Sequence, residues 1–171
     1  MKLPVLSSYA KSSDTLSFMA EENRFAVIQL AELKWPTSLR WSGNRFRLFV
    51  AADIRDVGVD AVSEFASAAL SRGMVYFCAW GRGCEKFHDI VDEVVVNDEL
   101  GERRFAGPTA NDGVMTTWHE HETLEQALDF FVTSAVPTQG FEVDSSFRVV
   151  MCLGNSDWAE TATRVLQSSS F

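Results

Sequence analysis

Short apolar runs of strand length alternate along this chain with stretches of helical periodicity, and this alternation constrains the fold more than any other feature. The clearest run is Met74–Trp80, which is apolar throughout, as expected of a strand covered on both faces. It follows a helical pattern over Asp60–Arg72. Strands and helices that alternate with short connections predict a mostly parallel sheet between two layers of helices.

The expected elements follow from the same patterns. We expect strands over Phe25–Leu30, Phe46–Ala52, Met74–Trp80, Glu93–Val96, Val114–Trp118 and Phe147–Leu153, and helices over Asp60–Arg72, Cys84–Val91, Leu124–Val136 and a last segment ending near Gln167. Residues 97–113 are polar and rich in glycine, which predicts a long loop. The predicted fold is α/β, a five- or six-stranded, mostly parallel sheet flanked by helices (a Rossmann-like three-layer sandwich). A single domain is expected over residues 24–171, after an N-terminal extension over residues 1–23.

The charge balance limits the classes of partner. The 171 residues include 15 Lys and Arg against 24 Asp and Glu, which gives a net charge of −9. Nucleic acids and anionic membranes are bound through Lys and Arg, so neither is an expected partner. A small molecule or a protein is the expected partner.

The compartment is inferred from targeting signals and cysteines. The first 20 residues contain no apolar run of signal-peptide length, and the chain contains no apolar run long enough to span a membrane. Cys78, Cys84 and Cys152 form an odd set, two of them within apolar runs, which is typical of free thiols in a reducing compartment. A cytoplasmic location is therefore expected.

Candidate binding residues follow the strands that are expected to lie in parallel. Ligands of open α/β sheets bind beyond the carboxyl ends of such strands. The residues expected at those ends, and hence to bind a ligand, are Asp53, Trp80, Gly81, Arg82, Gly83, Trp118, His119, His121 and Asn155. All three histidines of the chain, including His88, lie at or near this predicted edge.

The turn Gly81–Gly83 precedes a predicted helix, where backbone N–H groups can bind an anion, with Arg82 adding charge. The full dinucleotide fingerprint fails, because Cys84, Glu85 and Lys86 follow in place of its third glycine, and no P-loop motif is present. No cofactor is therefore expected. The alternative is a tight strand-to-helix turn that simply requires glycine.

Cys84, His88 and His119 are candidates for catalysis, and His119 with His121 is a candidate pair of metal ligands. Cys84 opens a predicted helix, where the helix dipole favours a thiolate, and His88 lies one turn later on the same face. His119 and His121 alternate on an extended segment, so both imidazoles can face one substrate or one metal ion. The spacing matches no zinc signature, and packing or solvated side chains are the alternatives for all four residues.

Two segments carry a resemblance to known proteins. The sequences CAWGRGCEKFHDIVDE over Cys78–Glu93 and MTTWHEHETLEQAL over Met115–Leu128 resemble those of a small bacterial family of uncharacterised, Rossmann-like single-domain proteins. The resemblance covers roughly residues 46–134. It implies a bacterial cytosolic protein of unknown function and assigns no catalytic residues.

Three functions are consistent with these observations. The first is a module that binds a ligand or a partner at the carboxyl edge of the sheet, since no complete catalytic motif is present. The second is a hydrolase or transferase that uses Cys84 with His88, or His119 with His121. The third is an acidic inhibitor or immunity-type protein, whose negative charge attracts a basic partner.

Overall fold

The computed structural model describes residues 15–20, 25–37, 39, 45–100, 113–141 and 147–169. Its strands are β1 Thr15–Ala20, β2 Phe25–Leu30, β3 Phe46–Ala51, β4 Met74–Trp80, β5 Met115–His119 and β6 Phe147–Leu153. Its helices are α1 Val59–Leu70, α2 Cys84–Leu100, α3 Leu124–Thr133 and α4 Ser156–Ser168, with a 3₁₀ turn, η1, over Gln139–Phe141.

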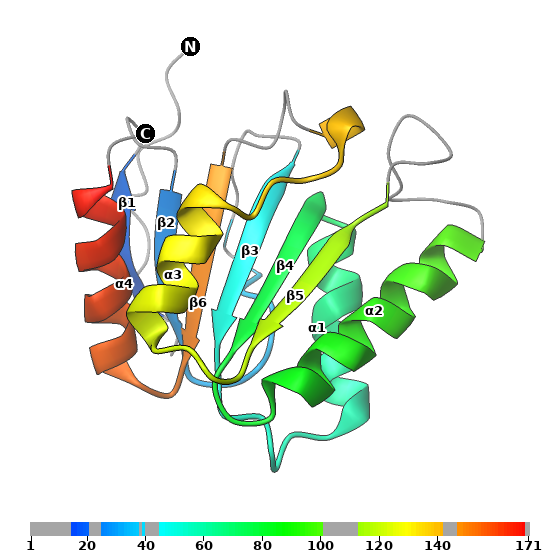
Figure 1. Ribbon diagram of the computed structural model, residues 1–171. Coiled ribbons are helices and arrows are strands. Elements are labelled where there is room, and N and C mark those ends of the chain that lie inside the picture. Colours follow the sequence, from blue (N-terminus) through cyan, green and yellow to red (C-terminus); the bar gives the residue numbers. More distant parts are fainter. Residues whose placement is uncertain are drawn as a thin grey trace.

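The strands form one six-stranded sheet in the order β1-β2-β6-β3-β4-β5. β1 is antiparallel to β2, and the other neighbouring pairs are parallel. The predicted α/β sandwich with a mostly parallel sheet is therefore confirmed. Because β3, β4, β5 and β6 run in the same direction, their carboxyl ends share one edge of the sheet (Figure 1).

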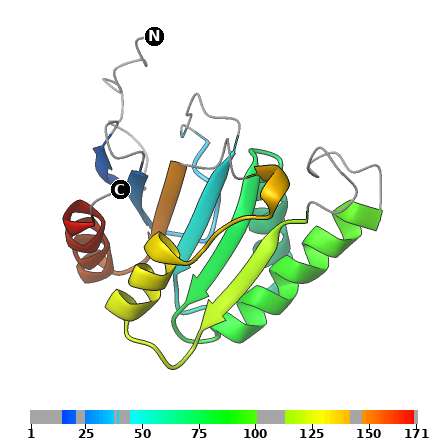
Figure 2. The same cartoon turned by 45° about the horizontal axis from the view of Figure 1, so that its top comes forward.

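The helices form a layer on each face of the sheet. α1 and α2 pack on one face, where Phe77 and Phe87 place their ring centroids 5.1 Å apart. α3 and α4 pack on the other face, where Phe49 and Phe131 lie 5.5 Å apart (Figures 1 and 2). These two apolar layers hold the sheet and fix the positions of the strand ends.

α3 begins at Leu124, the residue expected from the sequence, with a capping box formed by Thr123 and Gln126 at its start. The hydroxyl of Thr123 accepts a hydrogen bond from the Gln126 N–H at 3.2 Å, and the Gln126 side chain accepts one from the Thr123 N–H at 2.9 Å. This capping box satisfies backbone donors that have no partner within the helix. It also fixes the turn between β5 and α3, which lies at the carboxyl edge.

The strand and the loop expected after Val91 differ from the structure. The predicted strand Glu93–Val96 is wrong, because these residues continue α2 to Leu100. Residues 97–100 of the predicted loop also belong to α2, and residues 101–112 lie outside the described part of the chain. β1, in turn, lies within the expected N-terminal extension, so this extension contributes a strand to the sheet.

Candidate functional site

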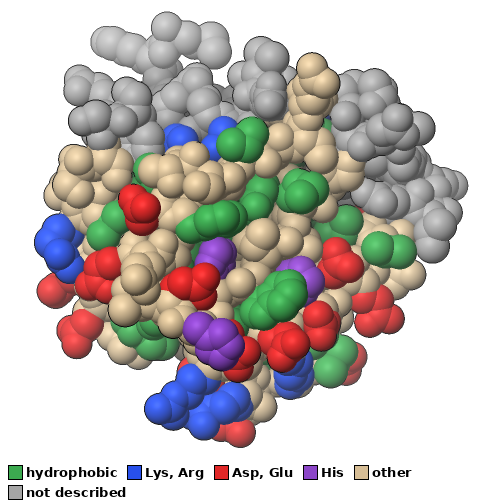
Figure 3. Space-filling view, viewed as in Figure 1, with side chains coloured by type: hydrophobic (Ala, Val, Ile, Leu, Met, Phe, Trp, Pro, Cys, Tyr) green, Lys and Arg blue, Asp and Glu red, His purple; other side chains and the backbone are tan. Residues whose placement is uncertain are grey.

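The residues predicted to bind a ligand lie at or just beyond the carboxyl ends of β3, β4, β5 and β6. They are Asp53, Trp80, Gly81, Arg82, Gly83, Trp118, His119, His121 and Asn155. Figure 3 shows histidine, acidic and exposed hydrophobic side chains next to one another in this part of the molecule. The partners of each side chain determine which of these residues remain available to a ligand.

The glycine turn after β4 packs directly against the segment that follows β3. Gly81 has a φ of 110°, and a Cβ built on it would lie 2.2 Å from the carbonyl oxygen of Ala52. Gly83 has a φ of 79°, with the side chain of Ile54 3.2 Å from the corresponding position. The Ile54 N–H donates to the Arg82 carbonyl at 3.0 Å. Glycine is required here by close backbone packing, which supports the structural interpretation of this turn.

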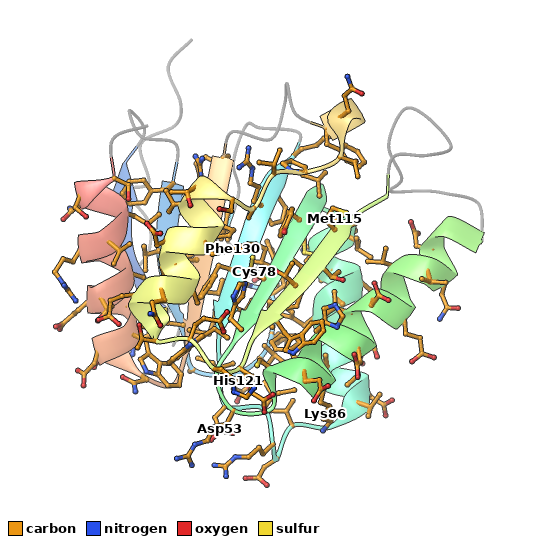
Figure 4. The ribbon with its side chains drawn as sticks, in the orientation of Figure 1. Asp53, Cys78, Lys86, Met115, His121 and Phe130 are labelled. Carbon is orange, nitrogen blue, oxygen red and sulfur yellow. The ribbon has the colours of Figure 1, made fainter. Side chains whose placement is uncertain are left out.

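Asp53 forms a bidentate ion pair with a nearby arginine. Arg55 donates from Nε and Nη2 to the two carboxylate oxygens at 2.9 and 2.7 Å. The hydrogen bond from the Arg55 side chain, assisted by the charge of Arg82, lowers the pKa of Asp53 to about 2. The carboxylate is therefore already paired within its own loop. Figure 4 labels Asp53 near the carboxyl ends of the strands.

Trp80 and Asn155 also have partners within the fold. The indole Nε1–H of Trp80 donates to the carbonyl of Glu122 at 2.9 Å, and its ring packs edge-to-face on Trp158 with centroids 5.4 Å apart. The Asn155 side chain accepts a hydrogen bond from the Asp157 N–H at 2.9 Å and so caps α4. Both residues stabilise the starts of the helices on this face.

The structure does not pair Cys84 with His88. Cys84 is 1% exposed in the core beneath α1 and α2. Burial raises the pKa of its thiol and outweighs the opposing hydrogen bond from the backbone N–H of His119. A buried thiol with a raised pKa is a poor nucleophile at neutral pH.

His88 joins a polar row between α2 and β5. Its Nε2 lies 3.0 Å from the Thr116 hydroxyl, which donates its own hydrogen to Asp92 at 3.1 Å. Its Nδ1 lies 3.2 Å from a carboxylate oxygen of Asp89. The imidazole ring packs on the ring of Trp118 with centroids 4.5 Å apart, although 45% of Trp118 is exposed. An exposed aromatic ring is thus held in one position by a hydrogen-bonded neighbour.

His119 joins a second row on the opposite face of β5. Its Nδ1 and Nε2 lie 3.4 Å from Glu122 and from the hydroxyl of Thr117, and its ring packs on Phe130 at 4.7 Å. The Thr117 hydroxyl is 3.2 Å from the sulfur of Cys78. Because a carboxylate only accepts hydrogen bonds, Nδ1 carries hydrogen and Nε2 accepts one from Thr117 in the neutral ring. Carboxylate, imidazole and hydroxyl therefore follow one another in a line.

Glu122 forms one end of this second row. Partial burial acts to raise the pKa of its carboxyl group, but hydrogen bonds from the His119 ring and from backbone N–H groups outweigh it and lower the pKa. One of these donors is the N–H of His121, at 3.2 Å. The carboxylate thereby fixes the turn that follows β5.

The two histidines that the sequence suggested as metal ligands differ in environment. His119 is 5% exposed and packs beneath α3, whereas His121 is exposed at the carboxyl edge (Figure 4). Within the described ranges, His, Cys, Asp and Glu side chains form no group of three or more that could hold a metal ion.

A groove of about 420 Å³ lies away from the end of β5. Its described lining is Gln29, Ser156, Ala159, Glu160, Thr163, Arg164 and Gln167. The residues predicted to bind a ligand are not part of that lining.

Sequence reasoning missed Thr116, Thr117, Glu122 and Asp92, which complete the two histidine rows. Thr116 and Thr117 are successive residues of an edge strand and therefore face opposite sides of the sheet. Their position beside Trp118 and His119 is a signal that strand alternation could have identified.

Comparisons with known proteins place the chain in a family without a described activity. No helix in the described part of the chain has the length and apolar character needed to cross a membrane. Comparison with curated proteins and with solved structures gave no match. A protein-family model named "Domain of unknown function (DUF7684)" matches residues 25–169, which include all of the described sheet except β1. The chain therefore belongs to the DUF7684 family.

Proposed function

We propose that the protein is a binding module that recognises a partner at the carboxyl edge of its sheet, around the end of β5. The proposed contact region, here called the Trp118 surface, consists of Trp118, His88, Asp89, Asp92 and Thr116. The observation that carries the proposal is the Trp118 ring, which is 45% exposed yet packed on the ring of His88.

A large aromatic side chain that is both exposed and fixed is well suited to binding. Trp is enriched among the residues that contribute most to protein interfaces, because it buries a large area on association. Its tilted packing on His88, which is itself bonded to Thr116, reduces the side-chain entropy lost when a partner binds. These properties favour a protein partner over a small molecule.

The other predicted binding residues support this choice of surface. Asp53 is paired with Arg55, Trp80 is bonded to the backbone of Glu122, and Asn155 caps a helix. A ligand would have to break these bonds in order to use the same groups. The ring of Trp118, which is 45% exposed, offers contact area without that cost.

The proposal extends to partner charge and to location. The net charge of −9 favours a basic partner, so an acidic inhibitor or immunity-type protein is one form of this function. We also propose a cytoplasmic location in a bacterial cell, which the free, buried thiols of Cys78, Cys84 and Cys152 support.

Site-specific photo-crosslinking in the native host tests the proposal. A photoreactive amino acid at Glu120, which is exposed next to Trp118, is expected to give a discrete adduct with a partner. The additional change Trp118→Ala is expected to remove that adduct. The matched control carries the photoreactive residue at Val59 of α1, which is 54% exposed. An adduct that survives Trp118→Ala, or no adduct beyond those of the Val59 control, would contradict the proposal.

A second candidate function, hydrolase or transferase, is favoured by the Glu122–His119–Thr117 row. Its order of carboxylate, imidazole and hydroxyl resembles the arrangement that activates a hydroxyl nucleophile. Hydrolysis of p-nitrophenyl acetate by the purified protein, lost in both Thr117→Val and His119→Gln, would support it. An unchanged rate in both variants would exclude this row as the catalytic site.

A further inference from the structure

We propose that β5 accepts an extended segment of the partner as an additional strand, and that this segment alternates basic with apolar residues. This inference rests on the proposed function, since it specifies what binds beside the Trp118 surface. It combines the position of β5 in the sheet with the chemistry of the side chains on its two faces.

The first argument is the position of β5. It is the last strand in the order of the sheet and pairs with β4 in register from Tyr76 with Met115 to Trp80 with His119. Within the described part of the chain, no strand pairs with its outer side (Figures 1 and 2). The outer backbone N–H and C=O groups of an edge strand form a template for a further strand.

The second argument is the composition of this edge. Proteins commonly protect edge strands from pairing with Lys, Pro or a bulge. β5, with the sequence MTTWH, contains neither Lys nor Pro, and its pairing with β4 proceeds without a register shift. Its residues Thr116, Thr117 and Trp118 are of types that favour strands. Within the described part of the chain, this edge therefore lacks three common devices that discourage strand addition, namely Lys, Pro and a bulge.

The third argument is the exposure of apolar side chains on both faces. Met115 is 43% and Trp118 45% exposed, within a strand of 5 residues. Trp118 lies on the face of α1 and α2, and Met115, by strand alternation, on the face of α3. An added strand would cover both, because its own side chains alternate between the same two faces.

The side chains on the α2 face favour basic residues in the partner. Asp89 has 71% of its side chain exposed, and Glu85 and Asp92 are exposed on the same helix. A Lys or Arg placed here can pair with these carboxylates and lie over the ring of Trp118 as a cation–π contact. The net charge of −9 also speeds the approach of a basic segment.

The side chains on the α3 face favour apolar residues. Met115 and Phe130 lie on either side of Cys78 in Figure 4, and the hydroxyl of Thr117 is directed to Cys78 and His119. The thioether of Met115 adapts to partners of different shape. Basic residues on one face and apolar residues on the other give the partner segment a period of two.

Fluorescence polarisation with synthetic peptides tests this inference. The probe is a labelled eight-residue peptide in which Arg and Val alternate. A control peptide has the same composition, with its Arg residues grouped at one end, and a second control carries N-methyl groups on alternate backbone nitrogens along one edge. The alternating peptide is expected to bind at least about tenfold more tightly than either control, since each 1.4 kcal/mol changes affinity tenfold.

Two variants assign the binding to the two faces. Asp89→Asn combined with Asp92→Asn is expected to weaken binding several-fold, and so is Met115→Ser. Hydrogen exchange of the backbone from Met115 to His119 is expected to slow in the complex, because strand pairing protects amides. Circular dichroism establishes that each variant is folded.

The outcomes separate this inference from the proposed function. Equal binding of the alternating, grouped and N-methylated peptides would overturn strand addition, because charge alone would then explain the affinity. Absence of binding by all three peptides would overturn it as well. In either case a Trp118-dependent crosslink at Glu120 would still support a partner at this surface.

Discussion

β4 and β5 are paired neighbours with opposite relations to solvent. Six of the seven residues of β4 are buried, whereas β5 exposes Met115 and Trp118 and buries His119. β4 lies between β3 and β5 beneath helices, while β5 forms the edge of the sheet. This difference indicates that the central strands contribute most to stability, whereas the edge strand exposes the surface that we propose for a partner.

The same contrast applies to the polar groups near the two strands. At the end of β4, glycines and an indole N–H are bonded or packed against other segments of the chain. Along β5, Thr116 and Thr117 each bond an imidazole, but on opposite faces. The Thr116 row supports an exposed tryptophan, and the Thr117 row lies against Phe130.

The largest expected effect is a loss of stability at Phe77, a core residue of β4, which we compare with the loss at Trp118 of β5. Phe77 is 1% exposed and packs on Phe87, so Phe77→Ala is expected to lower the free energy of unfolding by about 3–5 kcal/mol. Trp118→Ala removes an exposed aromatic contact and is expected to cost about 1 kcal/mol. Urea denaturation measures both. The milder change Phe77→Leu keeps the comparison measurable if Phe77→Ala does not fold, and equal losses at the two positions would refute the division of roles.

Much of this architecture could be predicted from the sequence. The apolar runs of β2, β3, β4 and β6 and the capping box of α3 are local signals that packing preserved. The segment Glu93–Val96 misled the prediction because consecutive β-branched residues favour strands. In the structure Val91 and Val95, spaced one helical turn apart, are buried, and Val96 is exposed. The helical period of burial therefore overrode the local preference.

The candidate site was predictable only in part. The rule that strand ends meet at one edge located Trp118 and His119 correctly at that edge. It did not reveal that Trp80 and Asn155 have bonding partners, nor that Thr116 and Thr117 complete the histidine rows. Those facts depend on which face each side chain occupies and on strand order, and both are set by tertiary packing.

A second prediction concerns the glycine turn that ties β4 to β3. Gly81→Ala forces a Cβ to within 2.2 Å of the Ala52 carbonyl oxygen at a positive φ. The free energy of unfolding is therefore expected to fall by more than about 2 kcal/mol. Gly154→Ala is the matched control, because Gly154 also has a positive φ, 69°, but no atom within 4 Å of a Cβ. Backbone strain alone is expected to lower the free energy of unfolding of the Gly154→Ala variant by about 1 kcal/mol. Similar losses in thermal unfolding would mean that the close approach to Ala52 adds nothing.

A third prediction compares the two threonines of β5. Thr117→Val leaves the buried Nε2 of His119 without its hydroxyl partner. The free energy of unfolding is therefore expected to fall by about 1–2 kcal/mol. Thr116→Val affects groups that water can reach, since Asp92 is exposed, and a change within about 0.5 kcal/mol is expected. Urea denaturation of the two isosteric variants makes the comparison. A larger loss at Thr116 would contradict the assignment of His119 to the more stabilising row.

The smallest expected effect concerns Asp53. It tests whether the Asp53 carboxylate stays paired with Arg55 in solution. The side-chain hydrogen bond from Arg55 lowers the pKa of Asp53 to about 2 from its ordinary 3.8, and NMR titration is expected to show this low value. Because the folded-state pKa is depressed, the small stabilisation is present above the unfolded value and is lost as the pH falls from about 4 to about 2. Arg55→Gln removes the main donor and is expected to return the pKa toward 3.8, whereas Lys86→Gln, at a nearby side chain bonded to the Val57 carbonyl, is expected to leave it unchanged. An ordinary pKa in the native protein would mean that the ion pair does not persist. The carboxylate and Arg55 would then both be available to a ligand, and the binding surface would extend from β5 to the end of β3.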